Sequence, residues 1–126
     1  MFDFFVHEVP NEGLCYGCSP ESLTDVRAIK NYQCTAVLNL MTKEEMEIRQ
    51  IAPDYEQLMC KQTNLNYVPF PIAHGSTDKM TDKLFQACLI LNDMINNKGE
   101  RVFVHCMSGT TRSPTLILLF LCLYRL

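Results

Sequence analysis

Short apolar runs alternate along the chain with longer segments whose apolar residues recur every three or four positions. The short runs predict strands, and the longer segments predict helices. We expect strands over residues 2–9, 14–17, 35–40, 66–72 and 101–106, and helices over residues 21–32, 42–64, 78–97 and 113–126. Strands that alternate with helices are typical of an α/β fold with a central, mostly parallel sheet flanked by helices.

Prolines refine two of these segments. Segment 42–64 is polar and should form two surface helices interrupted near Pro53, because proline cannot continue the first helix. The strand over 66–72 contains two prolines, which lack an N–H group for the hydrogen-bond ladder of a sheet. We therefore expect this strand at an edge of the sheet.

Capping residues mark where two helices begin. Thr42 and Glu45 have the spacing of a capping box, in which each side chain binds the backbone N–H of the other residue. Thr77 or Asp78 can cap the helix that follows. We expect the acidic side chains after Thr42 to form a solvated helix face: Glu44, Glu45 and Glu47.

The composition is that of a soluble globular protein. The chain has 126 residues, of which 48% are hydrophobic and 20% charged, and this predicts a single domain over residues 1–126. The formal net charge of -3 and the pI of about 5.5 argue against nucleic acid and against an anionic membrane as partners. Any anion that the protein binds must therefore be held by a local site.

The seven cysteines indicate a reducing compartment, because their number is odd and their spacing is not that of a disulfide framework. Cys15 and Cys18 have the gap of a metal or redox pair, but no second pair accompanies them, so we expect no metal and no cofactor. We see no cleavable leader, and the longest apolar run, residues 115–124, covers half of the roughly 20 residues that a membrane span needs. We expect a protein of the cytoplasm or the nucleus.

Residues 104–114, with the sequence VHCMSGTTRSP, carry the chemistry: a strand end, a loop of small residues and the start of a helix. Backbone N–H groups converge in such a loop, and the helix N-terminus adds roughly half a positive charge behind them. Arg112 can add a planar guanidinium that binds two oxygens of one anion. The segment therefore predicts a cradle for a tetrahedral phosphate.

Cys106 lies at the entrance of this loop, where the same positive field stabilises a thiolate. A buried cysteine is more often a packing residue, and this is how we interpret the other six. Cys106 differs because a preceding histidine, Gly109, Arg112 and Ser113 accompany it at fixed spacing. A thiolate that faces a bound phosphate is a nucleophile, so the segment predicts catalysis as well as binding.

At these residues the sequence resembles the dual-specificity phosphatases of the cysteine-dependent protein tyrosine phosphatase superfamily, whose active-site segment is similar to residues 105–114. Residues 23–29, 35–40 and 66–72 are similar to the early helix, a core strand and the strand before the general-acid loop of that family. The resemblance implies a protein tyrosine phosphatase-like fold. It also implies hydrolysis of phosphotyrosine, phosphoserine or phosphothreonine in a phosphoprotein substrate.

The resemblance implies a role for each residue of the segment. Cys106 attacks phosphorus in line and forms a cysteinyl-phosphate that water hydrolyses. Ser113 hydrogen-bonds the thiolate and helps it leave, and His105 organises the loop without transferring a proton. The residues that bind the phosphate oxygens are Met107, Ser108, Gly109, Thr110, Thr111 and Arg112.

The general acid is the point at which this sequence departs from the family pattern. The family usually carries an aspartate after the strand over 66–72 to protonate the leaving oxygen. His74 stands at that position, after Ala73, and the nearest carboxylate is Asp78. Histidine can itself serve as the acid, and Asp78 can either reach the site or only begin the helix. Otherwise the acid is absent, and the sequence leaves these alternatives open.

The length is a second departure. Domains of this family usually continue with further helices, whereas this chain stops at Leu126, so we interpret it as a C-terminally truncated domain. A helix as apolar as residues 113–126 should be buried on all sides. An uncovered face on it would support self-association.

Two other functions remain open. Residues 35–46 are similar to those of laforin-like glucan phosphatases, although these enzymes tend to have glycine where Thr111 stands. The other alternative is a phosphate-binding pseudophosphatase with weak or no turnover, motivated by His74 in place of the usual acid. The sequence around the loop shows no cluster of basic residues that would attract a polyanionic substrate.

Overall fold

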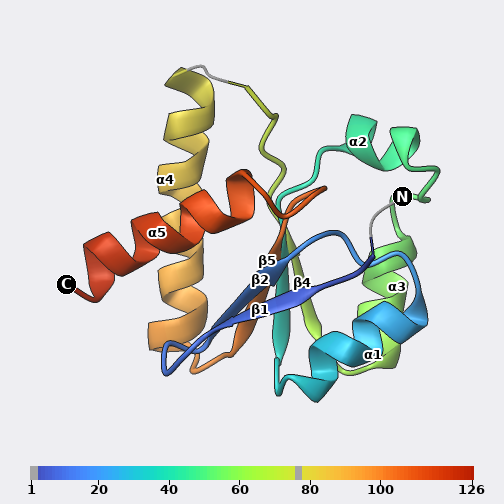
Figure 1. The fold of residues 1–126 in the computed structure, drawn as a ribbon, viewed down its shortest axis with the longest axis horizontal. Coiled ribbons are helices and arrows are strands. Elements are labelled where there is room, and N and C mark those ends of the chain that lie inside the picture. The colour runs from blue at the N-terminus through green and yellow to red at the C-terminus, as the bar shows by residue number, and fades with distance from the viewer. Residues whose placement is uncertain (1–2, 76–77) are drawn as a thin grey trace.

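The computed structural model describes residues 3–75 and 78–126, which form a five-stranded sheet in the order β1-β2-β5-β3-β4 with helices on both faces (Figure 1). The strands are β1 (Val6–Val9), β2 (Leu14–Gly17), β3 (Ala36–Asn39), β4 (Asn66–Pro69) and β5 (Val102–His105). β1 pairs with β2 antiparallel, and the other pairs are parallel. The predicted α/β fold with a mostly parallel sheet is therefore confirmed, and β4 lies at an edge as its prolines predicted.

The helices also follow the predicted order. They are α1 (Leu23–Asn31), α2 (Lys43–Ile48), α3 (Tyr55–Gln62), α4 (Asp78–Asn92), the π-helical turn η1 (Asp93–Asn97) and α5 (Arg112–Tyr124). The polar segment forms two helices on either side of Pro53, and the capping box of Thr42 and Glu45 is present. Asp78 is the first residue of α4, and the alternative cap at Thr77 lies outside the described residues.

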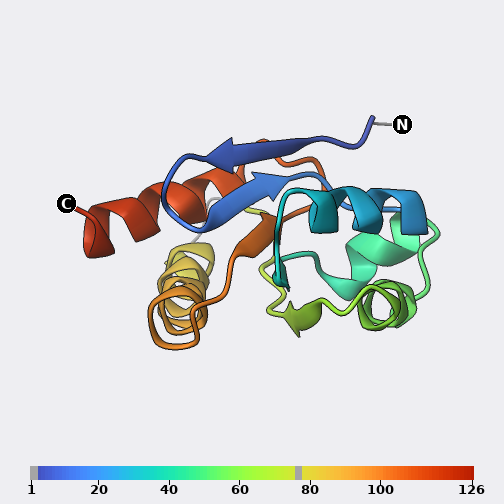
Figure 2. The same cartoon turned by 90° about the horizontal axis from the view of Figure 1, so that it is seen from below.

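The central strand β5 is buried on both faces of the sheet. The sheet lies between α4 and α5 on one face and α1 and α3 on the other (Figure 2). Val102 and Val104 belong to the core cluster that contains residues of α4 and α5, whereas Phe103 belongs to the cluster that contains residues of α1 and α3. Side chains alternate between the two faces of a strand, so a strand covered on both sides is apolar at every position. This packing fixes the end of β5, from which the loop that leads to α5 starts.

Three connections meet at the carboxyl ends of the parallel strands: the loop after β5, the start of α2 and the segment after β4 (Figure 1). Backbone hydrogen bonds join them, since the Leu40 N–H donates to the His105 carbonyl at 2.9 Å and the Ile72 N–H donates to the Leu40 carbonyl at 3.0 Å. On the side of β2, the Ser19 N–H donates to the Met107 carbonyl at 3.2 Å and joins the loop after β5 to the segment after β2. Ligand sites of parallel sheets lie at this end of the strands.

α5 departs from its expected burial. Leu118 and Leu123 of α5 are 63% and 52% exposed, and Phe85 and Leu89 of α4 are 48% and 62% exposed. The expectation that α5 is buried on all sides is therefore wrong here, because the sheet and α4 cover only part of its surface. Self-association through this face stays a prediction. Within residues 3–75 and 78–126, no helix has the length and hydrophobicity that crossing a bilayer requires.

Candidate active site

Cys106 directly follows β5 and is 1% exposed. Its Sγ lies 3.4 Å from the Oγ of Ser113, in the first turn of α5. Burial alone would raise the pKa of the Cys106 thiol, but hydrogen bonds from Ser113 and from the Gly109 backbone, with the charge of Arg112, hold it below its ordinary value. The structure thus brings together the cysteine, the serine and the arginine that the sequence predicted, in an environment that stabilises a thiolate.

The loop between β5 and α5 requires glycine at position 109. Gly109 has φ of +77°, and a Cβ built there would lie 2.7 Å from the carbonyl carbon of Gly17, 2.7 Å from the Phe5 ring and 2.9 Å from the Cys18 amide nitrogen. Gly17 and Cys18 lie at the end of β2, and Phe5 directly precedes β1, so the loop lies against both of these strands. The close contact holds the loop amides beside Cys106.

Gly109→Ala tests this contact. The variant is expected to lose about 1–3 kcal/mol of unfolding free energy, because alanine combines an unfavourable φ with a clash against backbone. Hydrolysis of an aryl phosphate, the activity that the resemblance implies, should also fall, since the loop must shift. Urea unfolding and initial rates measure the two effects. Gly99→Ala is the matched control, because Gly99 has φ of +67° with nothing within 4 Å of a built Cβ. Equal unfolding and equal rates in the two variants would contradict the interpretation.

Arg112 is the first residue of α5 and is held from two sides. Its Nη1 and Nη2 donate to the two carboxylate oxygens of Glu45 at 2.6 and 2.5 Å, and Nη1 also donates to the Ile72 carbonyl at 2.7 Å. Its Nε is buried and has no hydrogen-bond partner among the described residues. A buried N–H donor is costly without an acceptor, and a phosphate oxygen is the acceptor that a guanidinium suits.

Glu45 was expected on a solvated helix face, and this expectation is wrong. Its side chain is 14% exposed and forms the ion pair with Arg112, while it also closes the capping box with Thr42. Burial raises the pKa of Glu45, but the Arg112 and Thr42 hydrogen bonds outweigh burial and lower it. Because α2 begins just after the end of β3, its first turn lies beside the loop. The capping box therefore also fixes the position of the guanidinium.

His105 is fully buried, and both ring nitrogens have partners. Nδ1 lies 3.1 Å from the Cys106 carbonyl oxygen, and Nε2 lies 2.6 Å from Oε2 of Glu56. Glu56 is 4% exposed, although segment 42–64 was expected on the surface. No local sequence pattern predicts Glu56 as the partner of His105, and the one signal for a buried polar contact is Asn39, a polar residue in an otherwise apolar strand.

The two candidates for the general acid, His74 and Asp78, make no hydrogen bond to Cys106 in the described part of the chain, and both are exposed. His74 lines a cavity of about 460 Å³, whereas Asp78 is an exposed residue at the start of α4. The cavity adjoins the anchor of Arg112, because its wall includes Thr42 and the two residues that flank Ile72. The full lining is Thr42, Pro71, Ala73, His74, Gly75, Lys79, Met80 and Lys83.

Lys79 and Lys83 give this cavity a positive rim that the sequence around the loop did not predict. They come from α4, more than 20 positions before Cys106 in the sequence. Lys83 also lies over the Phe70 ring, with its Nζ 5.3 Å from the centroid. Two lysines at the wall of one cavity favour an anionic ligand there.

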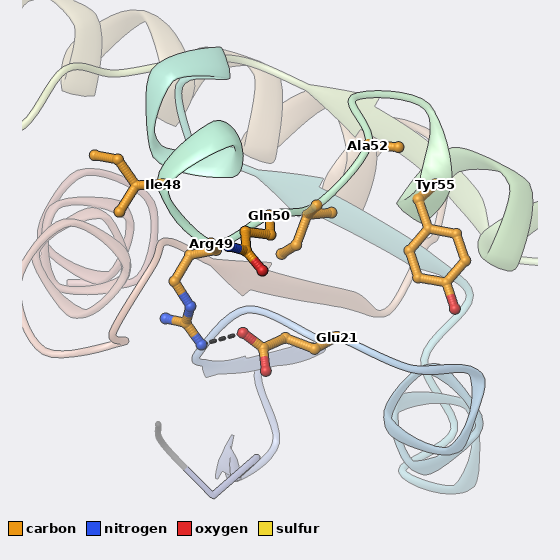
Figure 3. Close-up of a pocket in the computed structure, with 7 residues that line it drawn as sticks. Glu21, Ile48, Arg49, Gln50, Ala52 and Tyr55 are labelled. Atoms are coloured by element: carbon orange, nitrogen blue, oxygen red, sulfur yellow. Dashed lines mark hydrogen bonds and ion pairs between the residues drawn. The ribbon is translucent and has the colours of Figure 1, made fainter.

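A second cavity, of about 560 Å³, lies where the α2–α3 connection faces Glu21, just before α1. Figure 3 shows Arg49 and Glu21 joined by an ion pair, with Ile48 and Tyr55 at opposite sides. Among the described residues, none lines both cavities.

A buried cysteine, a loop of backbone amides and an arginine at a helix N-terminus, all at the carboxyl end of a parallel sheet, define the class of cysteine-dependent phosphatases. The family model "Dual specificity phosphatase, catalytic domain" matches residues 15–125, and the chain therefore belongs to this family. The resemblance inferred from residues 105–114 is confirmed.

Individual relatives agree with this assignment. Mouse laforin is 31% identical over 94 residues, which cover 66% of this chain and 28% of laforin. Human dual specificity protein phosphatase 5 is 34% identical over 59 residues, which cover 47% of this chain and 15% of that protein. This chain thus spans less than a third of either relative. The structure of the PTP-2 phosphatase of Cydia pomonella matches with a TM-score of 0.69 and 16% identity over 92% of this chain and 68% of that one, which shows the shared fold.

Proposed function

We propose that this phosphatase hydrolyses phosphotyrosine, and also phosphoserine and phosphothreonine, in protein substrates through a cysteinyl-phosphate on Cys106. One observation carries the proposal: the buried Cys106 thiol lies 3.4 Å from the Ser113 hydroxyl at the N-terminus of α5, the helix that Arg112 begins. A nucleophile and an anion site in contact can hold a phosphate in line for attack.

In the first step, the Cys106 thiolate attacks phosphorus, and the bond from phosphorus to the leaving oxygen breaks. Arg112 Nε, the loop amides and the N-terminus of α5 stabilise the charge on the equatorial oxygens. In the second step, water attacks phosphorus, the S–P bond breaks and the thiolate leaves with a hydrogen bond from Ser113. The products are the alcohol or phenol and inorganic phosphate.

We assign the proton for the leaving oxygen to His74. His74 lines the cavity that adjoins the anchor of Arg112, whereas Asp78 does not. His74 accelerates the first step only when the leaving group is a poor one, because a stable phenolate leaves without a proton.

His74→Ala is therefore expected to slow hydrolysis of a phosphotyrosine peptide by roughly 100-fold or more and to change hydrolysis of an activated aryl phosphate little. Initial rates on the two substrates measure both effects. Asp78→Asn is the control and should leave both rates unchanged; slowing of the peptide reaction in Asp78→Asn instead would assign the acid to Asp78.

The same rates, with Cys106→Ser as the reference, test the proposed function as a whole. Turnover of both substrates that depends on Cys106 supports it. Turnover of the activated ester alone means that no residue supplies the proton. Absence of Cys106-dependent turnover, together with binding of the phosphopeptide, would replace the proposal with the pseudophosphatase.

A glucan is the second candidate substrate, favoured by the 31% identity to laforin over 94 residues. Release of phosphate from amylopectin and from a phosphotyrosine peptide compares the two substrates directly. We expect the peptide to be the better substrate, and faster release from amylopectin would reverse the assignment.

For localisation we propose the cytoplasm or the nucleus. All seven cysteines are free thiols, and a reducing compartment keeps thiols in this state.

A further inference from the structure

Four buried or half-buried polar side chains from four different elements meet beneath the phosphate-binding loop. They are His105 of β5, Glu56 of α3, Asn39 of β3 and Tyr67 of β4. His105 Nε2 lies 2.6 Å from Glu56 Oε2, and the Asn39 amide donates to Glu56 Oε1 at 3.4 Å and to the Tyr67 hydroxyl at 2.8 Å. The proposed reaction assigns no role to Glu56, Asn39 or Tyr67.

The hydrogen bonds define which groups carry protons. The Cys106 carbonyl can only accept, so His105 Nδ1, 3.1 Å away, carries a hydrogen. The Met41 N–H donates to Asn39 Oδ1 at 2.8 Å, which turns the NH₂ group of Asn39 toward Glu56. Glu56 Oε1 therefore accepts from Asn39, which leaves Oε2 for His105. Glu56 Oε2 and His105 Nε2 are 2.6 Å apart, so a proton lies between them, and the charge and hydrogen bond of Glu56 favour its place on His105.

We propose that Glu56 is a positioning residue for the nucleophile: its carboxylate keeps the His105 ring doubly protonated, and this ring holds and electrostatically stabilises Cys106 in its thiolate form. The inference rests on the proposed function, in which the Cys106 thiolate attacks phosphorus. Glu56 acts only through His105 and touches neither substrate nor Cys106.

The surroundings of the pair agree with this assignment. Burial alone would lower the pKa of His105, but the charge and hydrogen bond of Glu56 outweigh burial and raise it. Burial raises the pKa of the Cys60 thiol to about 12 and also raises the pKa of Tyr67, so both groups stay neutral. On the remaining side, the Phe103 ring stacks on His105 with centroids 5.7 Å apart. The groups that can carry charge around the ring are therefore Glu56 and the Cys106 thiolate, within the described residues.

Glu56→Gln tests the proposal, because glutamine keeps the size and a hydrogen bond but removes the charge. Iodoacetamide alkylation of Cys106 is followed against pH by mass spectrometry of the peptide that contains it. We expect the midpoint of alkylation to rise by about one pH unit, so that alkylation below the midpoint slows about tenfold. The matched control is Glu47→Gln, an exposed residue of α2, which should leave the midpoint unchanged.

A purely structural role for Glu56 predicts a different result. Unfolding by urea would then require less denaturant, but the alkylation midpoint would stay in place, and this outcome would overturn the proposal. If Glu56→Gln does not fold, the ¹⁵N shifts of the His105 ring in the unmodified protein decide. Two protonated nitrogens at pH 7 are expected, and a neutral ring would overturn the proposal. Alkylation and ring shifts need no turnover, so a failed phosphatase assay does not affect either test.

Discussion

Replacing Cys106 with serine is expected to lower kcat/KM for a phosphotyrosine peptide by at least about 10⁴-fold while the protein still binds phosphate. Serine keeps the size of the side chain, but its hydroxyl stays neutral. A neutral hydroxyl is a much poorer nucleophile toward phosphorus than a thiolate. The groups that hold the anion, Arg112 and the loop amides, are unchanged by the substitution. Initial rates measure the loss of turnover, and calorimetric titration with inorganic phosphate measures the retained affinity.

One control variant and two contrary outcomes define the meaning of that result. Cys122→Ser changes an exposed thiol on α5 and should leave both rate and affinity at the values of the unmodified protein. Loss of both rate and affinity in Cys106→Ser would show that the loop had collapsed. A rate within tenfold of the unmodified protein would exclude Cys106 as the nucleophile.

Arg112→Lys is expected to lower kcat/KM by about 10²–10³-fold, and the affinity for inorganic phosphate should fall with it. Lysine cannot reproduce the two hydrogen bonds to Glu45 and an additional N–H directed at the phosphate, because it has one nitrogen instead of three. This variant therefore loses both binding and turnover, whereas Cys106→Ser should lose turnover alone. The same rate assay and phosphate titration measure the two effects.

Arg27→Lys on α1 is the matched control, since Arg27 is an exposed residue of a helix on the opposite face of the sheet from α5. It should change neither quantity. A kcat/KM for Arg112→Lys within tenfold of that of the unmodified protein would mean that the charge alone, and not the planar guanidinium, stabilises the transition state. The pairing of Arg112 with Glu45 would then have no catalytic consequence.

Much of this protein follows from patterns that are local in the sequence. The apolar runs predicted the strands, Pro53 predicted the break between α2 and α3, and Thr42 with Glu45 predicted the capping box. Residues 104–114 predicted a loop that binds an anion beside a cysteine. Each of these features is determined within a few neighbouring residues, by backbone geometry and side-chain periodicity, so the amino-acid order alone carries the information.

The tertiary structure decided the partners of the functional side chains. Glu45 reaches Arg112 across 67 positions, and Glu56 reaches His105 across 49, so no local pattern pairs them. Lys79 and Lys83 join the site because the start of α4 packs beside the segment after β4. The sequence by itself predicted the candidate nucleophile and its loop, because the motif is contiguous. Only folding determined which side chains hold Cys106 and its loop and which charged groups surround them, because the parallel strands bring distant segments to one end of the sheet.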